Sequence, residues 1–219
     1  MGETMSWRAE YPFKSHFWES PHGKIHYLDE APEKNDPSKP APVVVMVHGN
    51  PTWSFFYRNV VKELRDHCRC IVPDHLGCGL SDKPQQAPYT LATHIANLQG
   101  LLQHLNIKSA SLIVHDWGGP IGLGSFLLDA TSQSVAGKQI PTLEKLVVLN
   151  TAPGYSADVP KRILTCRLPI VGELLVRGLN GFAWPATWMA VTKPLPKQVK
   201  EGFLLPYGNW HDRIATHRF

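Results

Sequence analysis

The sequence lacks the features that mark several large classes of protein. It contains no block of five like charges, although Lys and Arg outnumber Asp and Glu by 22 to 18, so it has no linear signature of a nucleic-acid or membrane-surface partner. The longest unbroken apolar run, Val43–Val47, is far too short to span a bilayer. Residues 1–10 are polar and carry acidic side chains, unlike a signal or transit peptide. We therefore expect a cytoplasmic protein without a nucleic-acid or membrane partner.

Cysteine is also scarce, and its spacing argues against a zinc site. The four cysteines are Cys68, Cys70, Cys78 and Cys166. A zinc knuckle needs two paired Cys-Cys units, whereas this chain has a single Cys-x-Cys at the edge of an expected strand. We interpret Cys68 and Cys70 as reduced, packed thiols, and we expect neither a metal nor a cofactor.

The composition that remains is that of a globular protein. The 219 residues are 43% hydrophobic and 18% charged, which allows the chain to bury a core. This length suits one large domain, or one domain with an insertion. Proline and glycine, at 19 and 17 residues, follow no period and indicate many turns.

Strand-like and helix-like segments alternate along the first two thirds of the chain. Alternating polar and apolar residues at 15–20 and 24–31 flank a Pro-His-Gly turn and predict an antiparallel hairpin. The further expected strands are 43–47, 69–73, 110–114 and 145–149, with 145–149 as a third buried strand, and the expected helices are 55–65, 90–105 and 118–130. Such alternation predicts a mostly parallel sheet with helices on both faces, so the fold class is α/β.

The composition and the pattern of the sequence change after Thr151. Prolines recur there and separate short stretches rich in Trp and Leu, with no further buried strand. We predict a core at 1–152 and an inserted helical cap at 153–219 that covers the carboxyl edge of the sheet, where open α/β sheets bind ligands. The large apolar residues of the cap suit a small hydrophobic substrate, although we expect most of them to pack the cap itself: Phe182, Trp184, Trp188, Met189, Phe203 and Leu204.

Asp116 is the candidate nucleophile. The strand at 110–114 runs into His-Asp-Trp-Gly-Gly and then into a helix, and a small-x-nucleophile-x-small turn between strand and helix is the nucleophile elbow. A carboxylate that displaces a leaving group from saturated carbon forms an alkyl ester on the enzyme. The alternative is that Asp116 only caps the following helix.

Asn50 and Trp117 are the candidate oxyanion-hole and halide-binding residues. The segment His48-Gly49-Asn50-Pro51 directly follows the strand at 43–47, and in elbow-containing folds this loop and the residue after the nucleophile supply the two backbone N–H donors. Their side chains add an amide and an indole N–H, two neutral donors that suit a departing halide. Alternatively, Asn-Pro is an ordinary turn and Trp117 packs in the core. The Gly77-x-Gly79 segment lacks the third glycine of a dinucleotide site, so we interpret it as a structural loop.

These motifs together resemble those of haloalkane dehalogenases of the α/β-hydrolase fold, over nearly the whole chain from about residue 12. The matching segments are HGNPTWSFFYR (His48–Arg58), PDHLGCGLSDKP (Pro73–Pro84), VHDWGGPIG (Val114–Gly122) and the cap end PYGNWHDRIATHRF (Pro206–Phe219). The resemblance implies that Asp116 attacks the halogen-bearing carbon while Asn50 and Trp117 hold the halide. Water then hydrolyses the alkyl ester to an alcohol.

Three alternatives stay open. The β-lactone decarboxylases of olefin biosynthesis are similar to these dehalogenases and share the Asn/Trp pair. Epoxide hydrolases share the Asp elbow, but they usually carry an aromatic residue at position 50 and use two cap tyrosines, for which Tyr155 and Tyr207 are the candidates here. The third alternative is a remnant that binds substrate without turnover.

The dehalogenase resemblance also requires a histidine that activates water and an acid that orients it. Both follow later strands in the family, and Asn150 stands where some members carry the acid. We expect His115 to point away from the nucleophile. His48 and His75 belong to the two loops, and we expect His211 and His217 on the cap's helical surface. We therefore expect a truncated chain without the C-terminal strands, in which 145–149 is an exposed apolar edge and Asp116 is alkylated once.

Overall fold

A computed structural model describes residues 6–33, 40–127, 140–151 and 161–219. It contains one six-stranded sheet, which confirms the α/β class and the mostly parallel sheet. All predicted strands are present, with bounds within a few residues of those expected. They are β1 (His16–Ser20), β2 (Gly23–Glu30), β3 (Val43–Val47), β4 (Arg69–Pro73), β5 (Ser109–His115) and β6 (Thr142–Leu149).

The strand order is β1-β2-β4-β3-β5-β6. Strand β2 pairs antiparallel with β1, its partner in the hairpin, and with β4. Strands β4, β3, β5 and β6 run parallel to one another. The carboxyl ends of the four parallel strands therefore share one edge of the sheet, and the loops after β3 and β5 meet there.

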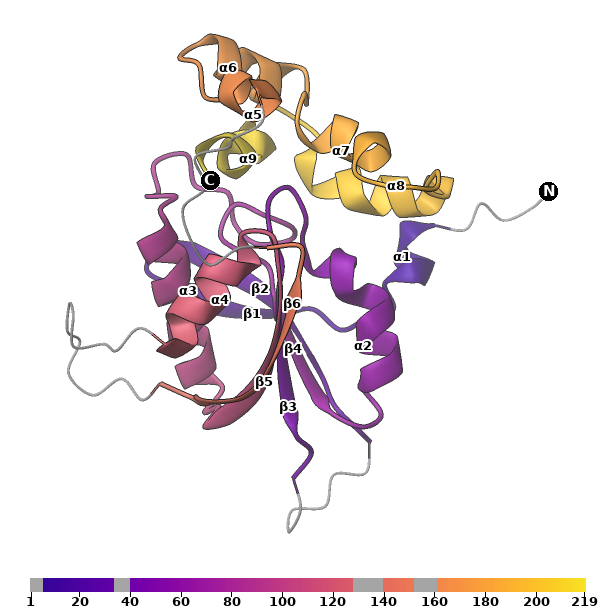
Figure 1. The fold of residues 1–219 in the computed structure, drawn as a ribbon, viewed down its shortest axis with the longest axis vertical. Coiled ribbons are helices and arrows are strands. Elements are labelled where there is room, and N and C mark those ends of the chain that lie inside the picture. Colours follow the sequence, from indigo (N-terminus) through magenta and orange to yellow (C-terminus); the bar gives the residue numbers. More distant parts are fainter. Residues whose placement is uncertain (1–5, 34–39, 128–139, 152–160) are drawn as a thin grey trace.

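Helices cover both faces of the sheet, as predicted from the continuous apolar run of β3. The 3₁₀ turn η1 (Ser54–Tyr57) leads into α2 (Arg58–Leu64) on one face, and α3 (Leu91–His104) and α4 (Gly118–Leu127) cover the other (Figure 1). Side chains of β3 alternate between the two: Val44 and Met46 join the cluster that contains Val61 of α2, while Val45 and Val47 join that of α3 and α4. The short helix α1 (Trp7–Glu10) adds to the first cluster.

The described part of the cap is helical and lies over the carboxyl ends of the parallel strands (Figure 1). Its elements are α5 (Lys161–Cys166), α6 (Val171–Glu173), η3 (Leu174–Gly178), α7 (Ala183–Met189), α8 (Lys197–Leu204), η4 (Leu205–Tyr207), η5 (His211–Arg213) and α9 (Ile214–Arg218). The predicted boundary at 152/153 lies outside the described residues. Among the helices described, none is long and apolar enough to cross a membrane.

β6 is the edge strand of the described sheet, and its apolar side chains are exposed. Leu146, Val147, Val148 and Leu149 are between 38% and 51% exposed, so the prediction of a buried strand is wrong and the prediction of an exposed apolar edge is confirmed. The physical reason is that β6 has a neighbour on one side only, β5, within the described residues. Such an edge is a template for association with another strand.

The exposure of β6 predicts opposite effects for two valine substitutions. Val148→Lys should change the free energy of unfolding by less than about 0.5 kcal/mol and reduce aggregation, because it adds a charge to an exposed edge. The matched control, Val45→Lys, places the same charge in the fully buried core and should prevent folding. Urea titration and light scattering measure both effects. Equal destabilisation by the two substitutions would contradict the exposed edge.

Candidate active site

Asp116 occupies a sharp turn between β5 and α4, as predicted for a nucleophile elbow. Its φ of +53° lies in the left-handed region, which is strained for a residue with a side chain. Two residues later, a Cβ on Gly118 would lie 2.0 Å from the carbonyl oxygen of Val47. Glycine is therefore required at position 118 for α4 to start directly against the end of β3.

The loop after β3 holds the Asp116 carboxylate. The backbone N–H of Asn50 donates a hydrogen bond of 2.9 Å to Asp116 Oδ1, and Gly49 packs so closely that a Cβ there would lie 2.1 Å from the same oxygen. No N–H of α4 within the described residues donates to this carboxylate. The arrangement therefore differs from the alternative in which Asp116 caps the helix, and it leaves Asp116 facing a cavity.

That cavity has a volume of about 280 Å³ and lies between the sheet edge and the cap. Asp116, Asn50, His115 and Asn150 contribute its polar wall. Most of the other lining residues are apolar. They come from the loop after β3, from η1, from α7 and α8, and from the segment between these two helices: Pro51, Phe56, Ala183, Ala186, Ala190, Val191, Leu195 and Phe203. The site thus combines a carboxylate with an apolar chamber, which suits a small hydrophobic substrate.

The two predicted halide donors are placed differently. Asn50 lines the cavity, but its side-chain Nδ2 donates to the carbonyl of Thr216 at 3.2 Å, and its Oδ1 is buried without a partner. Trp117 does not line the cavity. Its ring packs edge-on against Phe219, with centroids 5.7 Å apart, and against the cluster under α3 and α4. The structure therefore brings Asn50 and Asp116 together and leaves the indole of Trp117 aside.

His115 lines the same cavity as Asp116, so the expectation that it points away from the site is wrong. Its ring stacks on Phe56, with centroids 4.3 Å apart. Phe56, in η1, lines the same cavity. Burial lowers the pKa of His115, although nearby Asp116 opposes this.

His48 and His75 are structural, as expected for loop histidines. His48 Nδ1 donates to the carbonyl of Gly49 at 2.8 Å, and its Nε2 accepts the N–H of His75 at 3.0 Å. His75 Nε2 in turn donates to the carbonyl of His48 at 2.8 Å. Burial lowers the pKa of both rings.

The two cap histidines differ from each other. His211 is exposed as predicted, but His217 is half-buried and its Nδ1 has no hydrogen-bond partner.

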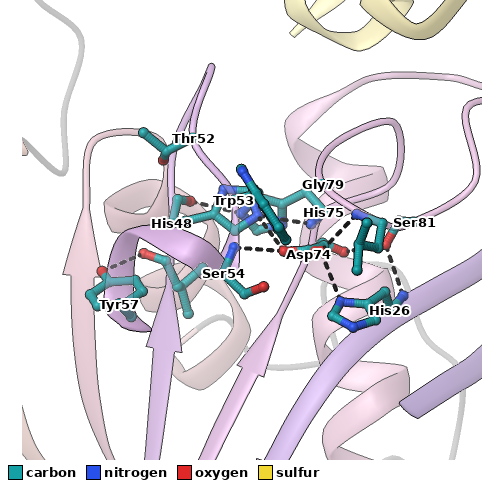
Figure 2. Close-up of polar contacts among 12 residues, drawn as sticks. His26, His48, Thr52, Trp53, Ser54, Tyr57, Asp74, His75, Gly79 and Ser81 are labelled. Carbon is teal, nitrogen blue, oxygen red and sulfur yellow. Dashed lines mark hydrogen bonds and ion pairs between the residues drawn. The ribbon is translucent and has the colours of Figure 1, made fainter. Parts of the chain in front are cut away.

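The buried carboxylate of Asp74, which has no distinctive signal in the sequence, lies at the centre of a hydrogen-bond network that includes Ser54 and His26 (Figure 2). It accepts hydrogen bonds from the Ser54 N–H at 2.6 Å and from His26 Nδ1 at 2.8 Å. It also accepts the N–H of Leu80 at 2.9 Å. Burial raises the pKa of Asp74, but His26 and these donors outweigh it and hold the pKa below its usual range. A Cβ on Gly79 would lie 2.2 Å from Asp74, so this glycine of the structural loop packs directly on the carboxylate, whereas Gly77 packs against Ala215.

The tyrosines required by the epoxide hydrolase alternative find no support in the described residues. Tyr207 is fully buried and donates to the carbonyl of Thr52 at 3.3 Å, and it does not line the cavity. Tyr155 lies outside the described residues.

Comparison with known proteins agrees with this fold. Residues 42–134 match the family described as the alpha/beta hydrolase fold. The chain is 42% identical, over 95% of its length and 62% of the relative's, to a cis-3-alkyl-4-alkyloxetan-2-one decarboxylase of Shewanella oneidensis. It is 40% identical to haloalkane dehalogenase 2 of Mycobacterium tuberculosis, over 52% of this chain and 37% of the relative's.

Among solved structures, a haloalkane dehalogenase from Bradyrhizobium elkani superposes with a TM-score of 0.76 at 22% identity. The superposition covers 94% of this chain and 68% of that one. The chain thus spans about three fifths of the length of the curated relatives that match nearly all of it.

His94 gives the protein a predictable dependence of stability on pH. Both of its ring nitrogens are buried without a partner, its ring stacks on Phe219, and burial lowers its pKa to about 4. Because the pKa of an unfolded histidine is about 6.5, the folded state should lose stability as pH falls from about 6.5 to about 4. Asp74 also contributes stability that depends on pH, because its pKa is lower in the folded state. This contribution is lost at lower pH, as the pH falls below the usual carboxyl pKa.

The test compares the wild type with His94→Phe, which keeps a stacked ring without a titrating group. The variant should lose less stability across this pH window, by at most about 3 kcal/mol, as measured by urea unfolding at several pH values. Identical pH profiles would show that His94 is not held neutral by burial.

Proposed function

We propose, from the premise that this chain has the α/β-hydrolase fold, that Asp116 attacks an electrophilic carbon of a small hydrophobic substrate. The observation that carries the proposal is a carboxylate on a strained elbow, held at 2.9 Å by the Asn50 N–H and facing an apolar cavity. The carboxylate oxygen bonds to the carbon, the leaving group departs with its electron pair, and an alkyl ester remains on Asp116.

Haloalkane dehalogenation is one reaction that begins this way. Halide leaves, water cleaves the ester, and the products are an alcohol, halide and a proton. The roles of Asn50 and Trp117 in holding the halide belong to this proposal. Since the amide is bonded to Thr216 and the indole lies against Phe219, both side chains would have to turn toward the cavity. Ester hydrolysis needs a base, and of the histidines in the described residues His115 lines the cavity.

Decarboxylation of a β-lactone is the second candidate, and one observation favours it. The decarboxylase relative matches 95% of this chain, cap included, whereas the dehalogenase relative matches 52% at similar identity. Asp116 would attack the saturated ring carbon that is bonded to the ring oxygen, and the bond between this carbon and the ring oxygen would break. The product is an ester on Asp116 with a free carboxylate on the neighbouring carbon. When CO2 leaves, the electron pair of the C–C bond that held it forms the C=C bond, and the Asp116 carboxylate is expelled. Neither water nor a base is consumed.

The products distinguish the two reactions. Incubation with a cis-3,4-dialkyl β-lactone should yield an alkene and CO2 if the chain acts as a decarboxylase, with little bromide from a bromoalkane of similar length. A dehalogenase should release bromide and leave the lactone intact. Gas chromatography and a halide assay measure both.

Asp116→Asn is the matched control for either reaction. It keeps the size of the side chain and should lower the rate on the order of 10³-fold or more, because an amide cannot form the ester. Binding of either substrate without any product from the wild type would instead favour the remnant.

A further inference from the structure

Helix α7 has two chemically different faces. Ala183, Ala186 and Ala190 line the cavity together with Thr187, so small side chains recur at helical spacing on the inner face. The outer face carries Trp184 and Trp188, four residues apart, and Met189 follows. The helix therefore roofs the substrate cavity on one side and presents large apolar groups on the other.

Those outer side chains are uncovered. Trp184, Trp188 and Met189 are 48%, 54% and 51% exposed, so the expectation that they pack the cap is wrong for these three, whereas Phe203 packs against Phe55. The two indoles lie edge to face with centroids 6.0 Å apart, and none of the three side chains lines the cavity. Adjacent exposed tryptophans on one helix face form an apolar surface of the kind that marks an interaction site.

The cap also concentrates positive charge. Residues 161–219 contain nine Lys and Arg against three Asp and Glu, although the whole chain has a net charge of only +4. Arg177 and Arg213 are buried: Arg177 bonds to Trp210 of the cap and to Gln85 of the core, and Arg213 bonds to the Arg177 carbonyl. Lys200 lies near the outer face, with its Nζ 5.5 Å from the Trp184 ring. Lys193, between α7 and α8, is exposed, and so is Lys197 at the start of α8, which pairs with Glu201 at 3.9 Å.

We propose that the outer face of α7, defined by Trp184, Trp188 and Met189, docks on an anionic lipid surface. Tryptophan flanked by lysine is the side-chain pattern that enters the boundary between headgroups and acyl chains. Figure 1 shows α7 beside α8 in the cap, on the side of the molecule opposite the amino ends of the parallel strands, with α5 and α6 still farther from the sheet. Docking there would bring the roof of the cavity to a reservoir of apolar molecules.

The inference revises the expectation of no membrane partner. That expectation rested on the absence of like-charge runs, but helices gather residues that are scattered in the sequence. The proposal uses the geometry of the cap and does not depend on the chemistry of Asp116.

Co-sedimentation of the 219-residue chain with vesicles tests the proposal. Binding to vesicles of phosphatidylcholine with phosphatidylglycerol should exceed binding to pure phosphatidylcholine and should weaken with added salt. The double variant Trp184→Gln/Trp188→Gln should bind at least about tenfold more weakly, and Lys193→Glu/Lys197→Glu should lose the preference for anionic lipid. Circular dichroism checks that each variant is folded.

Two control variants show whether vesicle binding depends on the outer face of α7. Phe17→Gln removes a side chain of similar exposure, 52%, on β1 outside the cap and should leave vesicle binding unchanged. Asp116→Asn should also bind vesicles normally, so failure of the proposed chemistry would not affect this result. Equal binding by the tryptophan double variant would overturn the proposal. So would a dimer in solution that this double variant dissociates, because a second copy would then cover the face.

Discussion

The close contact between the ends of β3 and β5 is the constraint on which the site depends. Gly118 lies against the Val47 carbonyl, and Gly49 lies against the Asp116 side chain. Without a Cβ at either position, the loop after β3 comes near enough for the Asn50 N–H to bond to the carboxylate. This contact makes one functional unit of two segments 66 residues apart in sequence.

Behind this contact, the Asp74 network fixes where the loop after β3 can run. Asp74 bonds to Ser54 at the start of η1 and to His26 of β2, while His75 and His48 bond to each other's backbone. These groups are fully or almost fully buried, so each hydrogen bond that is lost would leave a polar group without a partner in a poorly solvated place. The loop therefore has little freedom, and it holds the Asn50 N–H against the Asp116 carboxylate.

Much of this could be predicted from the sequence, since local patterns determine it. The continuous apolar run of β3, the alternation at β1 and β2, and the Asp-Trp-Gly-Gly turn each carry their own signal. Longer-range contacts have no such signal. Three such contacts depend on how distant segments pack in three dimensions: Asn50 bonds to Thr216, Trp117 packs on Phe219, and His115 stacks on Phe56. The exposure of the tryptophans on the outer face of α7 cannot be predicted from the sequence for the same reason. A tryptophan in a helix is usually buried, and its exposure depends on how the helix packs on the rest of the protein.

The most direct measurement is the intact mass of the protein after brief incubation with a bromoalkane and quenching in acid. If Asp116 attacks carbon, the mass should rise by one alkyl group, peptide mapping should place the group on Asp116, and Asp116→Asn should gain nothing. An adduct that persists in Asp116→Asn would contradict the assignment of Asp116 as the nucleophile. So would a folded wild type that gains no adduct and also forms no alkene from a cis-3,4-dialkyl β-lactone.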